Sequence, residues 1–205
     1  MQQRSQGFSG PPAAGLRLGF VTGATPDRWA ARWRERYPAE PLELVPVTEA
    51  EQETLLRQGD LDAALVREPV HRAGLHLVHL YDEQPVVVVP ADHVLTAFER
   101  VDPADLADEQ HVLPAPAALT LREPQLDFPA MTQREAVDVV ASGAGVAVLP
   151  MSVARLLHRR DVTYRPVDGL EPTGVGLAWL VERDDEQLQR LVGVVKGRTA
   201  RSSRG

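Results

Sequence analysis

Short apolar runs alternate along the chain with segments of helical period, most clearly in residues 131–157, MTQREAVDVVASGAGVAVLPMSVARLL. Thr132 and Glu135 have the spacing of a capping box, in which side chains and backbone exchange hydrogen bonds where a helix begins. Gly143 is placed to end that helix, because a residue without Cβ adopts the left-handed turn at a helix end. Val146–Leu149 is wholly apolar, which is typical of a strand buried on both faces. This order of elements indicates an α/β sheet.

The first third of the chain repeats this alternation. Thr25 is the predicted N-cap of a first helix, and Thr48 with Glu51 forms a second capping box. The strands predicted on either side of these two helices are Leu16–Val21, Leu42–Val47 and Asp60–Val66. A strand, helix, strand, helix, strand order predicts crossover connections and a parallel sheet.

The remainder of the chain is also predicted to alternate. Residues 114–129 are rich in proline and aperiodic, so we expect a loop, and a last helix is expected at about 185–195. The further predicted strands are Leu75–Tyr81, Gln84–Pro90, His111–Leu113, Val162–Pro166 and Gly174–Val181.

Composition narrows the class of protein. The 205 residues suffice for one domain or two small lobes, and they include no cysteine, which excludes disulfides and thiolate chemistry. The net charge of −7 argues against non-specific binding of nucleic acid by the folded body. No apolar run approaches the roughly 20 residues of a membrane span, and residues 1–15 lack the apolar core of a signal peptide. We therefore expect a cytoplasmic protein without membrane contact, with residues 1–15 disordered.

Signatures of common enzymes are missing from the sequence. Residues 142–145, SGAG, follow a helix and precede a strand, the reverse of a dinucleotide-binding fingerprint. There is no G-x-S-x-G, H-E-x-x-H or phosphate-binding P-loop. His76 and His79 lie three apart on a predicted strand, so they point to opposite faces and do not chelate one metal. We expect no catalytic residue, no metal and no cofactor.

Three segments resemble the effector-binding domain of LysR-type transcriptional regulators. They are LRLGF with RWRERYP and LELVPV, then LLRQGDLDAALV, and then EAVDVVASGAGVAVLPMSVA. The resemblance covers residues 16–195 and implies a type 2 periplasmic-binding-protein fold, with two α/β lobes joined by crossing strands. Residues 16–88 with 167–195 would form the first lobe and residues 89–166 the second. The crossings would be Val86–Pro90 and Val162–Pro166.

Two departures from the family accompany this resemblance. The DNA-binding winged helix-turn-helix that precedes the domain in the family is not seen before residue 16, so the chain is either an excised domain or a stand-alone protein. In addition, only residues 114–130 separate the His111–Leu113 strand from the Met131 unit, where the family has further helix and strand. We therefore expect a shortened second lobe and a more open cleft.

The resemblance implies that a small, often anionic effector binds between the lobes, near the carboxyl ends of the parallel strands. The turn at residues 22–25 would offer backbone N–H groups to an anion, although Thr25 could equally be only a helix cap. Arg67 would pair with a carboxylate, or else be a solvated arginine beside Glu68. The candidate ligand-binding residues are Thr22, Gly23, Ala24, Thr25, Thr48, Val66, Arg67, Pro114, Ala115, Ala144 and Gly145.

Residues 196–205 form a basic tail on this acidic chain, with Lys196, Arg198, Arg201 and Arg204 as its cations. Such a tail could contact a phosphate backbone or an acidic partner, or could simply be a disordered end. Two hypotheses follow. The first is an effector-sensing domain that forms a homodimer and reaches DNA through a missing or separate domain. The second is an interaction protein that acts through the tail or through the Trp29/Trp33 helix.

Overall fold

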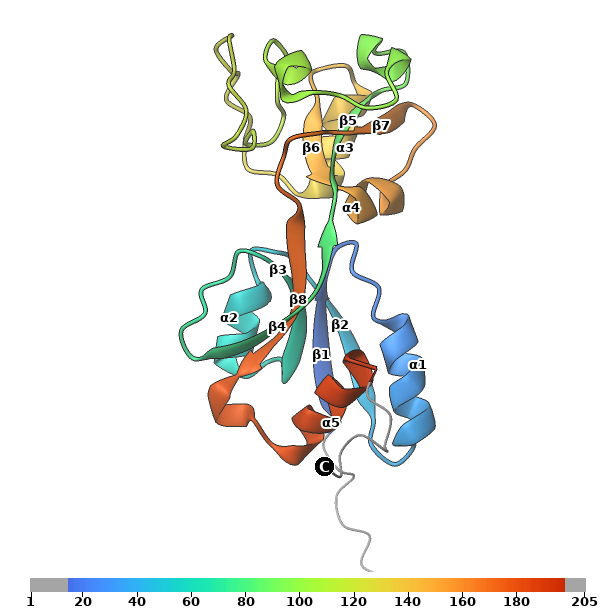
Figure 1. Cartoon of the computed structure of the whole chain (residues 1–205), viewed down its shortest axis with the longest axis vertical. Coiled ribbons are helices and arrows are strands. Elements are labelled where there is room, and N and C mark those ends of the chain that lie inside the picture. Colours follow the sequence, from blue (N-terminus) through green and yellow to red (C-terminus); the bar gives the residue numbers. More distant parts are fainter. Residues whose placement is uncertain (1–14, 198–205) are drawn as a thin grey trace, which may run out of the picture.

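The computed structural model of the chain describes residues 15–197, which form two α/β lobes arranged end to end (Figure 1). The first lobe contains a five-stranded sheet in the order β2-β1-β3-β8-β4, and the second a three-stranded sheet in the order β6-β5-β7. The predicted two-lobed α/β fold with a smaller second lobe is confirmed.

The elements have the following bounds. The strands are β1 (Leu16–Val21), β2 (Leu42–Val47), β3 (Ala63–Arg67), β4 (Leu75–Glu83), β5 (Pro85–Pro90), β6 (Ala147–Pro150), β7 (Val162–Pro166) and β8 (Thr173–Leu180). The helices are α1 (Asp27–Arg36), α2 (Gln52–Gln58), α3 (Gln133–Ala141), α4 (Met151–Leu156) and α5 (Glu186–Val195), with short 3₁₀ turns η1 (Val94–Ala97), η2 (Pro103–Leu106) and η3 (Val181–Arg183).

The first lobe has helices on both sides of its sheet. Strands β1, β2 and β3 are parallel, as predicted, while β8 is antiparallel to β3 and to β4. Helices α1 and α5 pack against each other, and α2 lies across the sheet from α1 (Figure 1). Trp33 of α1, Leu56 of α2 and Leu191 of α5 are fully buried in one core. Because both faces of the strands are covered, they read as nearly continuous apolar runs.

The second lobe is built around the four valines of β5, which is antiparallel to both of its neighbours. Val86 and Val88 pack with α3 and α4, whereas Val87 and Val89 pack on the other face with the segment that contains η1 and η2. The expectation that Val146–Leu149 is buried on both faces was only partly right. In this sheet β6 is an edge strand, flanked only by an isolated bridge between His111 and Val146, so Val148 is half-buried.

The strand pairing also bears on how the lobes divide. Val86–Pro90 and Val162–Pro166 pair with each other inside the second sheet, so they are not the segments that pass between the lobes. The second sheet begins at Pro85, before the expected boundary at residue 89. We therefore propose that the lobes divide near residues 84 and 168.

Four predictions about individual elements can be compared with the structure. The Thr132–Glu135 capping box is present, and Gly143 takes the left-handed conformation after α3. Thr25 is not the N-cap of α1, because the helix begins at Asp27 with Pro26 in the capping position and no side-chain cap. Residues 111–113 form no strand, only the isolated bridge at His111.

Residues 114–129 contain no helix or strand, as predicted. Among residues 15–197, no helix combines the length and apolarity that crossing a bilayer requires. The expectations for residues 1–14 and 198–205 lie outside the described part of the chain.

Candidate functional site between the lobes

The carboxyl ends of the parallel strands face the second lobe (Figure 1). The turn after β1 at residues 22–25, the turn after β2 at residues 48–51 and the last residue of β3, Arg67, come together there. The opposite side is formed by the first turn of α3 at Gln133 and the start of α4 at Ser152. Contacts between these segments set the geometry of the site.

Arg67 is the centre of this face. Arg67 is only 3% exposed. Its Nε and Nη2 donate to Glu83 Oε2 at 3.1 and 2.7 Å. Nη2 also donates to the carbonyl of Thr22 at 3.1 Å, and Nη1 donates to Glu49 Oε1. The backbone of Arg67 is fixed as well, since Gln52 exchanges two hydrogen bonds with it. Arg67 is therefore not a solvated arginine beside Glu68, because carboxylates of the protein itself pair with it.

Glu49 connects the two lobes. Its Oε1 accepts from Arg67 Nη1 in the first lobe and from Gln133 Nε2 in the second, at 2.9 Å. The Glu49 side chain is 40% exposed, whereas that of Glu83 is only 6% exposed. The guanidinium thus has one buried carboxylate partner and one that is open to solvent.

Gly23 is a second point of contact between the lobes. It has a φ of +90°, and a Cβ at this position would collide with Ser152 Oγ and stand 3.1 Å from Val153 N. Ser152 Oγ is buried and has no hydrogen-bond partner among the described residues. The second lobe therefore fits closely over the turn after β1 at this point.

The structure gives the predicted first-lobe residues different environments. Thr22 contributes its carbonyl to Arg67, Ala24 is buried and Thr25 is exposed. Val66 was expected to face the cleft. Its side chain is instead fully buried in the core.

Thr48 is occupied locally. Its Oγ1 donates to Glu51 Oε2 at 2.7 Å and accepts from Glu51 N at 3.3 Å. The side-chain hydrogen bond from Thr48 lowers the pKa of Glu51 below its ordinary value. The capping box predicted for this pair is thus formed, one turn before the first assigned residue of α2.

The predicted second-lobe residues lie away from the contacts between the lobes. Ala144 and Gly145 precede β6, and a Cβ on Gly145 would collide with the carbonyl oxygen of Gln110 within the same lobe. The contacts to the first lobe described above come instead from Gln133 at the start of α3 and from Ser152 after β6. Ala115 packs inside the second lobe and Pro114 is exposed. We therefore leave Pro114, Ala115, Ala144 and Gly145 out of the proposed site.

The interaction-protein hypothesis relied on the Trp29/Trp33 helix and on the basic tail. Trp29 and Trp33 are buried in the first-lobe core, so neither ring is available to a partner. Lys196 is exposed after α5, whereas Arg198, Arg201 and Arg204 lie outside the described residues.

Glu49, Glu83, Gln133 and Ser152 were not predicted from the sequence. Gln133 had a local signal, because it sits inside the Thr132–Glu135 capping box and so at the start of a helix. The other three have none, since their roles depend on contacts between distant elements.

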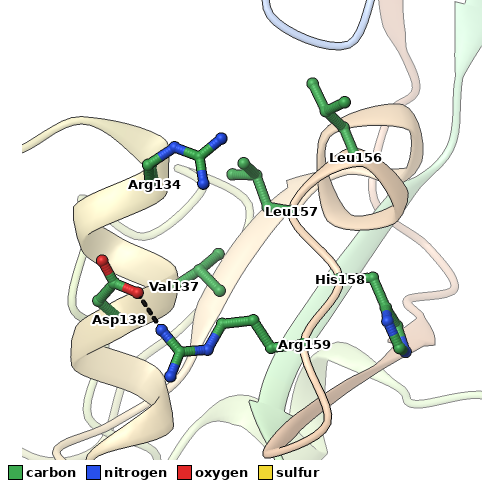
Figure 2. Close-up of a pocket in the computed structure, with 7 residues that line it drawn as sticks. All are labelled: Arg134, Val137, Asp138, Leu156, Leu157, His158 and Arg159. Carbon is green, nitrogen blue, oxygen red and sulfur yellow. Dashed lines mark hydrogen bonds and ion pairs between the residues drawn. The ribbon is translucent and has the colours of Figure 1, made fainter.

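A cavity of about 240 Å³ lies between α3 and the end of α4 (Figure 2). All of its lining residues belong to the second lobe, so it is not part of the interlobe face. Arg159 at its edge is paired with Asp138 and with Asp161, the latter at 2.7 Å, so its charge is already neutralised. The lining residues are Arg134, Val137, Asp138, Leu156, Leu157, His158 and Arg159.

A cavity of about 470 Å³ lies at the other end of the first sheet, near the amino ends of β1 and β2. Its buried Asp62 accepts from the backbone N of Arg17 at 2.7 Å and pairs with Arg183 at 2.8 Å. These contacts give Asp62 a structural role in joining β1, β3 and η3.

The sequence matches the model of one protein family, the LysR substrate binding domain, over residues 9–200. The chain belongs to this family. The predicted resemblance is therefore confirmed, and it covers nearly the whole chain.

Curated relatives are transcriptional regulators. The Hca operon transcriptional activator HcaR of Escherichia coli (strain K12) is 27% identical over 202 residues, which cover 90% of this chain and 68% of the activator. A probable hydrogen peroxide-inducible genes activator of Mycobacterium avium is 34% identical over 164 residues, which cover 71% of this chain and 52% of that protein. The chain thus spans from about half to two thirds of the length of these relatives.

Solved structures show the same fold. The BenM effector binding domain with its effector benzoate has a TM-score of 0.72 and 22% sequence identity, covering 89% of this chain and 90% of that one. The reduced form of the OxyR regulatory domain from Pseudomonas aeruginosa has a TM-score of 0.69 and 24% identity, covering 90% of this chain and 96% of that one.

Proposed function

We propose that this LysR substrate-binding domain senses a small, anionic effector between its two lobes and regulates transcription as part of a LysR-type regulator. The observation that supports this most directly is Arg67. It lies at the carboxyl end of a parallel strand, where ligands of open α/β sheets bind, and one of its N–H groups is held by the exposed carboxylate of Glu49. A guanidinium in this position suits a carboxylate ligand.

The ligand class is further limited by composition. Two of the relatives' names refer to hydrogen peroxide or to a reduced form, yet the 205 residues here contain no cysteine. Because reversible thiol oxidation needs a cysteine, we favour non-covalent binding of an effector over a redox response of this domain. We propose no catalytic role, in keeping with relatives that are regulators.

The partners of the domain are also part of the proposal. We infer a homodimer in the cytoplasm, with DNA bound by a separate domain. The net charge of −7 opposes binding of DNA by the body, so a contact through residues 196–205 would be weak and salt-dependent. Fluorescence anisotropy with a labelled duplex, with and without residues 196–205, measures that contribution.

A thermal-shift screen of small carboxylates, including benzoate, tests the effector proposal. A ligand that binds only the native state adds about 2.7 kcal/mol of stability at a hundredfold excess over its Kd. We expect Arg67→Lys to lose this shift, because an ammonium does not reproduce the guanidinium geometry. The control Arg57→Lys changes an exposed arginine of α2 that binds the carbonyl of Ala73 and should keep the shift. Equal shifts in both variants would contradict the proposed site.

A further inference from the structure

The carboxylate of Glu49 is surrounded by groups that would suit a bound anion. Its Oε1 receives one N–H from Arg67 and one from Gln133, which come from different lobes. A bound carboxylate that joins the two lobes would be expected to have the same two partners. The site is therefore occupied by a side chain of the protein itself.

Neutralising Arg67 does not require Glu49. Glu83 is buried beside Arg67 and accepts from both Nε and Nη2, so it already supplies one negative charge for one positive charge. Glu49 adds a second carboxylate to the same guanidinium, which leaves the trio with a net charge of −1. An anion cannot bind beside this trio without like-charge repulsion unless one carboxylate leaves.

The two carboxylates differ in how readily they can leave. Removing Glu83 would strand a buried charge, which is costly, whereas Glu49 is 40% exposed and can rotate into water. A ligand carboxylate that replaced Glu49 would keep the charge around Arg67 unchanged. It would also take over the hydrogen bond from Gln133 and so preserve the link between the lobes.

We propose that Glu49 is a built-in competitor of the effector, whose carboxylate occupies the place on Arg67 and Gln133 that the effector's carboxylate takes on binding. The inference rests on the proposed function, since it assumes an effector between the lobes, and it adds a carboxylate as the recognised group. It further implies that binding releases the Glu49 side chain, while the turn at residues 48–51 stays held by the bonds between Thr48 and Glu51. The link between the lobes thereby passes from a side chain to the ligand.

The test is an NMR titration of the wild type and of Glu49→Gln with formate, acetate and benzoate, each compared with its neutral amide. Gln keeps the size of the side chain and removes its charge. Because a charge-assisted hydrogen bond is no longer lost on binding, we expect Glu49→Gln to bind the carboxylates about tenfold more tightly. The neutral amides should bind Glu49→Gln no more tightly than they bind the wild type. The side-chain signals of Arg67 and Gln133 should shift in both proteins as carboxylate is added.

The matched control is Glu53→Gln, which removes a charge from the same lobe at a residue that pairs with Arg57 instead of Arg67. It should leave the affinities unchanged. If Glu49→Gln fails to fold, Glu49→Ala replaces it with the same expectation.

The outcomes separate this inference from the proposed function. If Glu49→Gln binds carboxylates no more tightly than the wild type, or gains equally for the amides, the inference is wrong even where the wild type binds. If the wild type binds none of the probes and Glu49→Gln binds the carboxylates, the inference is supported and the proposed function is contradicted for these anions. If neither protein binds a carboxylate, both are contradicted.

Discussion

Gly23 of the first lobe and Ser152 of the second meet so closely that a methyl group on Gly23 would collide with Ser152 Oγ. The contact joins the turn after β1 to the start of α4. The carbonyl of the preceding residue, Thr22, accepts from Arg67, so the same turn is connected to the centre of the proposed site. Opening of the lobes must therefore separate Gly23 from Ser152.

Gly23→Ala is expected to loosen the contact between the lobes, because the added Cβ would collide with Ser152 Oγ and stand 3.1 Å from Val153 N, so both residues must shift. Amide hydrogen exchange should be faster at residues 151–153, where the second lobe loses its cover.

Gly59→Ala is the matched control for Gly23→Ala. Gly59 has a φ of +76°, close to the +90° of Gly23, but a Cβ there would meet nothing within 4 Å. Both variants carry the strain of a left-handed non-glycine residue, about 1–3 kcal/mol. Equally faster exchange at residues 151–153 in the two variants would show that backbone strain, not the contact with Ser152, is responsible.

His111 is expected to make the stability of the second lobe depend on pH. It is only 4% exposed, and burial lowers the pKa of its imidazole below the ordinary value of 6.5. The unfolded chain therefore binds a proton at a higher pH than the folded chain does. The stability that neutral His111 contributes is complete above pH 6.5 and is lost as the pH falls from there through the lower, folded-state pKa.

Urea unfolding at pH 7.5 and pH 5.5 measures this effect. The free energy of unfolding of the wild type should be lower at pH 5.5 than at pH 7.5. The decrease should be smaller for His111→Gln. Each pKa unit between the folded and unfolded states corresponds to about 1.4 kcal/mol. An identical fall in both proteins would assign the pH dependence to other groups.

Gln125 fastens the loop at residues 114–129 to the rest of the second lobe. Its Oε1 accepts from the backbone N of His111 at 2.7 Å, and its Nε2 donates to the carbonyls of Glu109 and Glu123, both at 3.2 Å. Gln125→Ala should reduce stability by about 1–3 kcal/mol, since it leaves the His111 N–H, which lies in a buried residue, without its partner. The neighbouring Leu126 is 67% exposed, so Leu126→Ala should change thermal stability by less than about 0.5 kcal/mol.

Local pattern was enough to predict most of the elements. The four valines of β5, the capping box at Thr132 and the glycine after α3 each determine the nearby backbone through burial, hydrogen bonding or a left-handed turn. The edge of the second lobe's sheet beside β6 was harder to predict. Residues 111–113 resemble a strand by composition, but they contribute a single bridge at the edge of a three-stranded sheet.

Arg67 was expected at the end of β3 because strand order and polarity are readable from the sequence. The structure places it beside Glu49, which also bonds to Gln133 of the second lobe. Its partners could not be read in this way. Glu49, Glu83 and Gln133 lie on three other segments, and the bond from Gln133 to Glu49 spans 84 residues. Only the packing of the two lobes brings them together.

Glu49 and Glu83 should show strong non-additivity in stability, because they share one guanidinium. Glu83→Gln removes the buried partner of Arg67 but leaves Glu49 within reach, so the loss should be smaller than the 3–5 kcal/mol typical of breaking a buried pair. Glu49→Gln should cost about 1 kcal/mol or less, since Glu83 still neutralises Arg67.

The double variant leaves the buried arginine without any carboxylate, so its loss should exceed the sum of the two single losses by about 1–3 kcal/mol. Urea unfolding of the four proteins at pH 7.5 measures this coupling. Simple additivity would mean that the two carboxylates act on Arg67 independently, and that Glu49 does not substitute for Glu83.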